Sequence, residues 1–512
     1  MEQLDNTEIR TKNDGLISIR DLSREDILSL IRDSQKIKEE KMYVRESVVR
    51  SNSKIASLFF ENSTRTRVSS ETAARNQGFY VNGFAGVEGT SVKKGEPLMD
   101  TVRMFEGYGY QAIIMRHELA GAARFAADNL NIPVINGGDG SSGHPTQTLL
   151  DLFTIYEDKQ RIDGLKIALV GDLKYGRTVH SLLDALSLFD VEVYLVSPNG
   201  LNMPQWKVAD YTSVSGKVPI VVTDLKEILS KLDVLYMTRI QRERFHLGIE
   251  GEAEFKKASG LFVLNRDLLE RYAKKDLIVL HPLPRDKNNM EISTDVDNTP
   301  YAKYFIQAQN GLYMREALIR KIINTSSISS STFPAKSPRA LLKRSPGSLN
   351  LPIIDGQKKG DKYHYRLDEG TLIDHIEVNQ GLKLYKMLDL DKISGSEVVL
   401  CTNIRSKQFE RKDVLAIHKL ILSTQQLYKI ALLSPKHTIN IIKGQRVIKK
   451  ERAILPSPLY DLLICNNPLC ISRSEHNEFA RSIFYVESDD PLQVRCHYCE
   501  EIFSRKEISI AY

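Results

Sequence analysis

Hydrophobic residues in the first 325 positions form short apolar runs separated by longer stretches of helical spacing. The stretch 23–40 predicts a helix with Ser23 as its N-cap. Strand-like runs follow at 54–60, 78–81, 111–115 and 132–136, and a second series lies at 166–170, 192–196, 234–238 and 277–280. This alternation is typical of parallel sheets covered by helices on both faces. The pattern therefore predicts two similar α/β domains facing each other across a cleft, closed by a helical stretch at 301–323.

The pattern changes after residue 325. Residues 326–360 are rich in Ser, Pro, Lys and Arg and contain one acidic residue, Asp355, which predicts a flexible linker. The next part, 361–454, is predicted to be α+β. Its expected strands lie at 382–390 and 397–403, and its expected helices at 411–422 and 425–433. The last part, 455–512, has few long apolar runs, so it needs a metal or another crosslink to fold.

Length and composition add limits to this picture. A chain of 512 residues with 42% hydrophobic content is expected to form several globular domains. Its 71 Lys and Arg against 65 Asp and Glu give a net charge of +6, which is small for this length and makes no strong case for a nucleic-acid or membrane partner. Because no apolar run approaches 18 residues and the start is polar, a cytoplasmic protein is expected.

The segment Ser63-Thr64-Arg65-Thr66 lies between the strand-like run 54–60 and a stretch of helical composition. A helix N-terminus offers unpaired N–H groups and the positive end of the helix dipole, and here hydroxyl and guanidinium groups surround it. The segment predicts a phosphate site. An ordinary N-cap, with Arg65 on a solvated face, is the alternative.

Two further motifs follow predicted strands. Arg116 stands at the C-terminal end of its strand, where open α/β sheets bind ligands. His144 and Gln147 are one turn apart at the start of a predicted helix, after a glycine run that also contains Gly138-x-Gly140-x-x-Gly143. That run raises a dinucleotide-binding alternative, which is disfavoured because His and Pro open the helix and no acidic strand end follows at the ribose-binding distance.

Arg177, Arg239 and Arg285 each come just after a predicted strand of the second series. Three guanidinium groups aimed into one cleft would suit a substrate with several carboxylates, because guanidinium pairs with carboxylate through two parallel hydrogen bonds.

Taken together, the motifs S-T-R-T-R, M-R-H, H-P-T-Q, G-D-L-K-Y-G-R-T-V-H-S, M-T-R-x-Q-x-E-R and H-P-L-P-R resemble the catalytic chain of aspartate carbamoyltransferases over about residues 5–325. Ornithine carbamoyltransferases are an alternative, but they carry a cysteine where this chain has His281-Pro-Leu-Pro284. The resemblance implies the carbamoyltransferase fold, with a carbamoyl-phosphate domain at 1–145, an aspartate domain at 146–300 and a final helix at 301–325. It also implies carbamoyl transfer from carbamoyl phosphate to L-aspartate in pyrimidine biosynthesis, without a catalytic metal.

The same resemblance implies roles for individual residues. The phosphate would be held by Ser63, Thr64, Arg65 and Thr66. The carbamoyl oxygen would be polarised by Arg116, His144 and Thr66, and the carbamoyl NH₂ group would be fixed by Gln147, Leu283 and Pro284. The aspartate carboxylates would be held by Arg177, Arg239 and Gln241, while Glu61 and Arg244 would be structural charges.

The loop Thr90-Ser-Val-Lys-Lys-Gly-Glu96 resembles the segment that this family inserts into a neighbouring subunit's site. Ser91 and Lys94 would then be catalytic donors, with Lys93 as an alternative to Lys94. A shared site of this kind implies a homo-oligomer built from catalytic trimers.

Cys465-x₄-Cys470 and Cys496-x₂-Cys499 have the spacing of a four-thiolate structural zinc site, with Cys401 outside it. A zinc ribbon that binds nucleic acid is an alternative, although the segment lacks a basic stripe with interleaved aromatic residues. Residues 455–512 resemble the zinc domain of the aspartate carbamoyltransferase regulatory chain, and 361–454 resemble its nucleotide-binding domain. The resemblance implies a catalytic chain fused to a regulatory chain, six copies per particle and effectors of the CTP and ATP class. It assigns the effector site to Asp374, His375, Asn440, Ile442, Val447 and Lys450, while Ala416 departs from the family's lysine.

Overall fold

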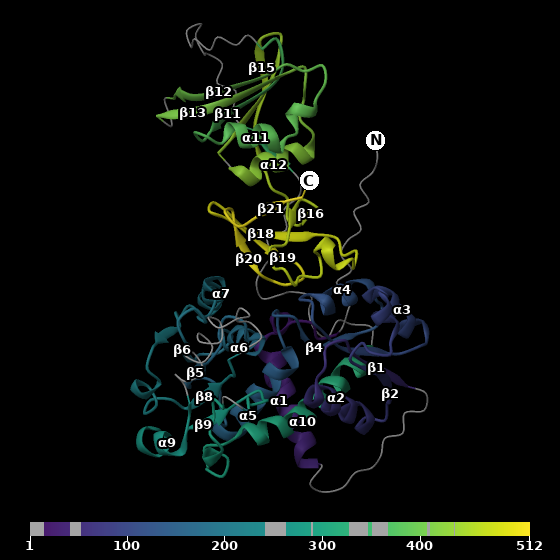
Figure 1. Ribbon diagram of the computed structural model, residues 1–512, viewed down its shortest axis with the longest axis vertical. Coiled ribbons are helices and arrows are strands. Elements are labelled where there is room, and N and C mark those ends of the chain that lie inside the picture. The colour runs from purple at the N-terminus through teal and green to yellow at the C-terminus, as the bar shows by residue number, and fades with distance from the viewer. Residues whose placement is uncertain are drawn as a thin grey trace. The chain divides into compact units, whose positions relative to one another are not determined.

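The computed structural model describes residues 15–40, 53–240, 263–287, 290–326, 347–350, 367–406, 410–434 and 436–511. These residues divide between two compact units, the first built mainly from positions before Ala340 and the second mainly from positions after it. Figure 1 shows the helices and strands of each part along the chain.

The first sheet of the N-terminal unit is parallel, with strand order β2-β1-β3-β4. Its strands are β1 (Lys54–Phe59), β2 (Tyr80–Ala85), β3 (Ala112–His117) and β4 (Val134–Asp139). Its helices are α1 (Arg24–Glu40), α2 (Thr64–Asn76), α3 (Leu98–Gly107), α4 (Ala122–Asn129) and α5 (Pro145–Lys159). The apolar runs predicted as strands all lie in or beside these strands. The glycine run does not form a tight turn directly after a strand, because β4 continues through its first three residues.

The second sheet of this unit is also parallel, with strand order β7-β6-β5-β8-β9. Its strands are β5 (Lys166–Val170), β6 (Glu192–Val196), β7 (Ile220–Val222), β8 (Val234–Met237) and β9 (Ile278–Leu280). Its helices are α6 (Arg177–Leu186), α7 (Gln205–Ser215) and α9 (Arg266–Tyr272). The edge strand β7 is the one strand of this sheet that the apolar pattern did not predict, since it is short and largely exposed.

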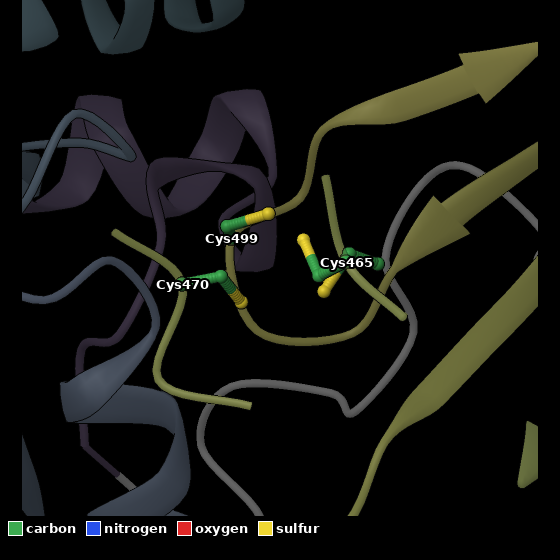
Figure 2. Close-up of side chains that lie close together, drawn as sticks. Cys465, Cys470 and Cys499 are labelled. Carbon is green, nitrogen blue, oxygen red and sulfur yellow. The ribbon is translucent and has the colours of Figure 1, made fainter. Parts of the chain in front are cut away.

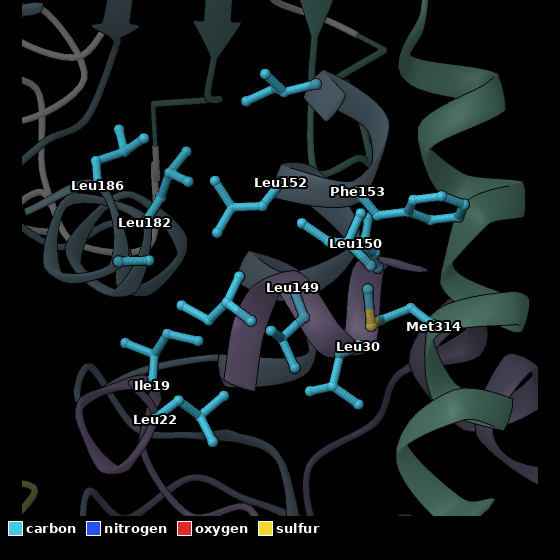
Figure 3. Packing of buried hydrophobic residues seen from close by; sticks show 14 of the residues in the cluster. Ile19, Leu22, Leu30, Leu149, Leu150, Leu152, Phe153, Leu182, Leu186 and Met314 are labelled. Carbon is cyan, nitrogen blue, oxygen red and sulfur yellow. The ribbon is translucent and has the colours of Figure 1, made fainter. Parts of the chain in front are cut away.

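The long helix α10 (Tyr304–Ser326) returns to pack against α1, α2 and α5. One cluster of buried apolar side chains extends from these helices to α6, and Figure 3 shows Leu149, Leu150, Leu152 and Phe153 at its centre. Because α5 is buried along most of its length, the helix that follows His144 is firmly held.

The second unit contains a six-stranded sheet of order β10-β15-β14-β11-β13-β12. Its strands are β10 (Gly347–Asn350), β11 (Glu369–Ile376), β12 (Val398–Arg405), β13 (Arg411–His418), β14 (Thr438–Lys443) and β15 (Arg446–Ile454), and its helices are α11 (Gly381–Met387) and α12 (Thr424–Leu433). Strand β10 falls within the segment expected to be a linker, most of which lies outside the described residues.

Two predictions for this part are wrong. Residues 411–422 were expected to be helical, but 411–418 form β13, whose backbone bonds to β11 and β12 and whose residues Val414, Leu415 and Ile417 are buried. Residues 382–390 were expected to form a strand, but Gly381–Met387 is α11. Its residues Leu384 and Met387 are three positions apart and both buried, so they lie on one side of a helix.

The C-terminal residues form two small sheets, β16-β18-β19-β20 and β17-β21. The strands are β16 (Leu459–Tyr460), β17 (Leu463–Ile464), β18 (Ile483–Asp489), β19 (Leu492–Cys496), β20 (Ile502–Ser504) and β21 (Ser509–Ile510). Among the helices that the structure describes, none is sufficiently long and apolar to cross a membrane.

Candidate active site

The predicted phosphate segment lies at the start of α2. Ser63 precedes the helix in an extended conformation, and its side chain makes no capping hydrogen bond. Thr64 and Arg65 are exposed, whereas Thr66 is buried. Since the Ser63 hydroxyl is not used as a cap, the ordinary N-cap alternative loses its main support. The neighbouring Arg67 pairs with Glu71 at 3.1 Å, four positions along α2, so this ion pair lies within the helix.

His144 is the N-cap residue of α5, and its ring is buried. Its Nε2 lies 3.3 Å from the Thr66 hydroxyl, and its Nδ1 lies 3.4 Å from the Thr146 hydroxyl. Burial, with the charges of Arg116, Arg177 and Arg315, holds the pKa of His144 well below its ordinary value. The imidazole is therefore neutral near pH 7 and can donate one hydrogen bond.

Glu61 links two of the predicted arginines. Its Oε1 accepts from Arg116 at 2.9 Å, and the Arg177 guanidinium donates to both of its oxygens at 3.0 and 3.1 Å. Burial and the nearby Arg177 lower the pKa of Arg116 to about 10. Burial acts to raise the pKa of Glu61, but the two arginines hold it below its ordinary value. The carboxylate is therefore ionised and fixes both guanidinium groups.

The end of β4 gathers these side chains. A methyl group added to Gly138 would come within 3.5 Å of both the Arg177 guanidinium and the His144 ring, and one added to Gly137 would come within 3.5 Å of Thr66. Gly138 also has a positive φ of 112°. The side chains of Thr66, His144 and Arg177 therefore all lie close to the end of β4.

The remaining predicted ligands come from the second sheet. Arg239 follows β8, whereas Gln241 and Arg244 lie outside the described residues. The Leu283 N–H donates to His281 Nδ1 at 2.8 Å, which fixes the start of the Leu283-Pro284 loop. Arg285 makes two hydrogen bonds to Asp297, at 2.6 and 3.0 Å, and so serves its own domain.

Ser91 and Lys94 both lie in the short 3₁₀ helix Ser91–Lys94 and are exposed. Lys93, the alternative donor, pairs with Glu88 at 2.7 Å. Neither Ser91 nor Lys94 is brought to the site of its own chain by any contact that the structure describes.

The four cysteines of the C-terminal segment come together. Cys465, Cys470, Cys496 and Cys499 are buried, and their sulfur atoms all lie within 4.8 Å of one another. Figure 2 shows the sulfur atoms of Cys465, Cys470 and Cys499 converging. Four thiolates around one tetrahedral Zn²⁺, at about 2.3 Å each, would stand roughly 3.8 Å apart, so the cluster has the right size for a metal. Cys401 lies outside it, as predicted.

Family models match four successive parts of the chain. Residues 15–157 match the aspartate/ornithine carbamoyltransferase carbamoyl-P binding domain, and residues 163–322 match the Asp/Orn binding domain. Residues 365–453 match the aspartate carbamoyltransferase regulatory chain allosteric domain, and residues 457–509 match its metal binding domain.

Individual relatives are similar over about three fifths of the chain. The aspartate carbamoyltransferase catalytic subunit of Chromobacterium violaceum is 47% identical over 309 residues, which are 60% of this chain and 97% of that protein. That of Thermococcus kodakarensis is 48% identical over 60% of this chain and 96% of its own length. The chain belongs to the aspartate carbamoyltransferase family.

Solved aspartate carbamoyltransferase structures agree with this assignment. The catalytic subunit from M. jannaschii is 43% identical with a TM-score of 0.56, covering 62% of this chain and all of that one. The Trypanosoma cruzi enzyme in complex with carbamoyl phosphate is 36% identical with a TM-score of 0.56, covering 61% and 96%. The chain is a transferase that joins the catalytic domains of this family to its regulatory allosteric and metal-binding domains.

The predicted effector residues of the aspartate carbamoyltransferase regulatory part share one region of the six-stranded sheet. Asp374 and His375 lie on β11, Asn440 and Ile442 on β14, and Val447 and Lys450 on β15. The pairing places Ala416, Leu372, Asn440 and Lys450 in one row across β13, β11, β14 and β15. The position where this chain departs from the family's lysine therefore stands in the same row as two predicted effector residues.

Sequence reasoning missed a buried group beside the carbamoyltransferase site. Asp151 lies one turn after Gln147 on α5 and bonds to residues 85 and 156 positions away, which no local pattern reveals. The i, i+4 spacing of Gln147 and Asp151 was the one available signal.

Proposed function

We propose that the catalytic half performs carbamoyl transfer from carbamoyl phosphate to L-aspartate with Arg116, His144 and Thr66 at the carbamoyl oxygen. The observation that carries this proposal is the buried contact of 3.3 Å between His144 Nε2 and the Thr66 hydroxyl, beside two arginines fixed by Glu61. A neutral histidine, a hydroxyl and a guanidinium are all donors that can stabilise a developing oxyanion.

The phosphate end of the substrate would lie at the N-terminus of α2. Ser63, Thr64 and Arg65 would bind its oxygens together with the first N–H groups of the helix. At the opposite side, the carbamoyl NH₂ group would meet Gln147 and the Leu283-Pro284 loop. This orients carbamoyl phosphate with its carbonyl carbon open to attack.

The reaction needs no covalent enzyme intermediate. The uncharged α-amino group of aspartate attacks the carbamoyl carbon, a tetrahedral intermediate forms, and its bond to the phosphate oxygen then breaks. The nitrogen loses one proton, and the products are N-carbamoyl-L-aspartate and phosphate. The rate would come from holding both reactants together and from donors at the oxyanion, each of which is typically worth about 3 to 4 kcal/mol.

Aspartate would be held by Arg177, Arg239 and Gln241. Because Ser91 and Lys94 are exposed and Lys93 is already paired with Glu88, Ser91 and Lys94 are the better donors for a neighbouring subunit's site. The complete site would then require a catalytic trimer.

For the regulatory half we propose Zn²⁺ at the four cysteines and nucleotides of the CTP and ATP class on the sheet that carries Asp374 and Lys450. Two catalytic trimers bridged by three pairs of regulatory parts would give six copies. Positions 327–346 separate α10 from β10, and roughly 20 residues could reach about 60 Å if extended, at about 3.3 Å each.

One assay tests the reaction. The purified chain is supplied with carbamoyl phosphate and either L-aspartate or L-ornithine, and phosphate release is followed. Phosphate release is expected with aspartate and not with ornithine. Release with ornithine alone, or with neither amino acid, would overturn the proposal.

A further inference from the structure

A buried carboxylate, Asp151, lies behind the residue proposed to hold the carbamoyl NH₂ group. Asp151 is fully buried on α5 and accepts three hydrogen bonds. Gln147 Nε2 donates to Oδ1 at 2.8 Å, Gln307 Nε2 donates to Oδ1 at 2.6 Å, and the Tyr236 hydroxyl donates to Oδ2 at 2.9 Å. This carboxylate therefore joins α5 to α10 and to β8.

Gln307 extends the network to the loop after β9. Its Oε1 accepts from the backbone N–H of His281 at 2.8 Å. His281 in turn accepts from the Leu283 N–H through Nδ1, and its Nε2 bonds to Glu291 at 2.6 Å. A continuous chain of hydrogen bonds thus connects Gln147 with the start of the Leu283-Pro284 loop.

The direction of each bond in this chain is fixed. A backbone N–H can only donate, so the Gln307 oxygen must face His281 and its NH₂ group must face Asp151. Oδ1 of Asp151 is thereby an acceptor, and Gln147 must present its own NH₂ group to it. The carbonyl oxygen of Gln147 then points away from Asp151.

The protonation of Asp151 does not alter this direction. Burial raises the pKa of Asp151 to about 7, so the neutral form is accessible. A proton would lie on Oδ2, where the Tyr236 oxygen can accept it, while Oδ1 with its two NH₂ donors stays an acceptor.

We propose that Asp151 and Gln307 are positioning residues that orient the Gln147 carbonyl oxygen and the Leu283-Pro284 loop as acceptors for the carbamoyl NH₂ group. The inference rests on the proposed function of Gln147, Leu283 and Pro284. Its consequence is selectivity for a substrate with an NH₂ group over one with a methyl group at the same place.

Acetyl phosphate is the matched probe, because it keeps the phosphate and the carbonyl of carbamoyl phosphate and replaces NH₂ with CH₃. The quantity measured on the purified full chain is the inhibition constant of acetyl phosphate divided by the KM of carbamoyl phosphate. A general loss of structure weakens both ligands, whereas lost orientation weakens only carbamoyl phosphate.

Asp151→Leu removes the acceptor with little change in size. It is expected to raise the KM of carbamoyl phosphate roughly 10-fold or more and to leave the inhibition constant of acetyl phosphate within about twofold, as one to two lost hydrogen bonds would do. Asp151→Asn can turn its oxygen to the two glutamines and its NH₂ group to the Tyr236 oxygen, so it should restore the ratio. If Asp151→Leu does not fold, Gln307→Met provides the same test. A methionine can neither donate to Asp151 nor accept from His281, so this variant should also lower the ratio.

Asn310→Ser is the matched control. Asn310 is one turn from Gln307 on α10, and it joins Thr154 and Glu157 on α5 without contacting Gln147. It should lower stability and leave the ratio unchanged. An unchanged ratio in Asp151→Leu or Gln307→Met would overturn the inference. So would a ratio that falls by the same factor in Asp151→Asn as in Asp151→Leu. No turnover of carbamoyl phosphate by the unaltered chain would instead overturn the proposed function.

Discussion

The catalytic half folds around an apolar core that extends from α1 and α5 to α6 and α10, whereas residues 457–509 form short strands around four buried thiols. The catalytic half is stabilised by apolar surface that folding removes from water, and this surface is distributed over many side chains. In residues 457–509, a single bound metal would contribute folding energy directly. The two regions should therefore unfold under different treatments. A treatment that unfolds one region and leaves the other folded shows which of them is needed for catalysis.

Loss of a metal ligand should have the largest effect. Cys496→Ala is expected to abolish metal binding and unfold residues 457–509, because structural zinc contributes about 10 to 16 kcal/mol in small domains. Protease mapping should locate cleavage in this segment, and kcat with saturating aspartate should be retained. Cys401→Ala is the control, since Cys401 lies outside the cluster. A Cys496→Ala chain that keeps both its metal and its protease resistance would contradict the assignment.

A break in the apolar core should act on the other region. Phe153→Ala is expected to destabilise the catalytic half by about 3 to 5 kcal/mol, because Phe153 is completely buried. Thermal unfolding followed together with activity should show both lost at a lower temperature, while the metal content is unchanged. Phe479, with 84% of its surface exposed, supplies the control Phe479→Ala. Equal melting temperatures of the two variants would argue against this core.

Within the catalytic half, substitution of two different arginines should change different kinetic constants. Arg116→Ala is expected to lower kcat by roughly 10² or more, as loss of an oxyanion donor does. Arg239→Ala should chiefly raise the KM of aspartate. Arg67→Ala, which removes only the pair with Glu71, should change either constant by less than about threefold. Small and equal effects at Arg116 and Arg239 would count against their assigned roles.

Mild acid should destabilise the catalytic half by a smaller amount. Burial, with Lys207 nearby, lowers the pKa of His180 to about 4, below the ordinary 6.5. Below pH 6.5 the unfolded chain therefore binds a proton that the folded chain does not, and stability falls until about pH 4. The loss at pH 5 is about 2 kcal/mol for this histidine. Denaturant titrations at pH 7.5 and 5 should show a smaller difference for His180→Gln, and an identical difference would refute the assignment.

Much of the catalytic fold could be predicted from the sequence because its parallel strands are buried on both faces and appear as continuous apolar runs. β5 and β6 lie where the pattern placed them, at Lys166–Val170 and Glu192–Val196. His144 and Gln147 could be placed because helix spacing is local. Glu61 was predicted as a structural charge, yet no local pattern indicated that it would hold both Arg116 and Arg177.

The regulatory sheet was harder to predict because its pairing partners are distant. Residues 411–418 have no strong strand alternation, and β13 is extended because β11 and β12 supply its backbone hydrogen bonds. The same holds for Asp151, whose partners Tyr236 and Gln307 come from separate elements. Local sequence patterns carry no information about such contacts.

The independence of the metal-binding region and the catalytic core is tested most directly by removing the metal. Particle mass and activity are then measured on the same sample. A mercurial or a chelator is added to the full chain, and light scattering is read beside phosphate release. A particle near six times 58.1 kDa is expected to become catalytic trimers that stay active and no longer respond to nucleotides. An unchanged particle after complete metal loss, or activity lost together with the metal, would contradict it.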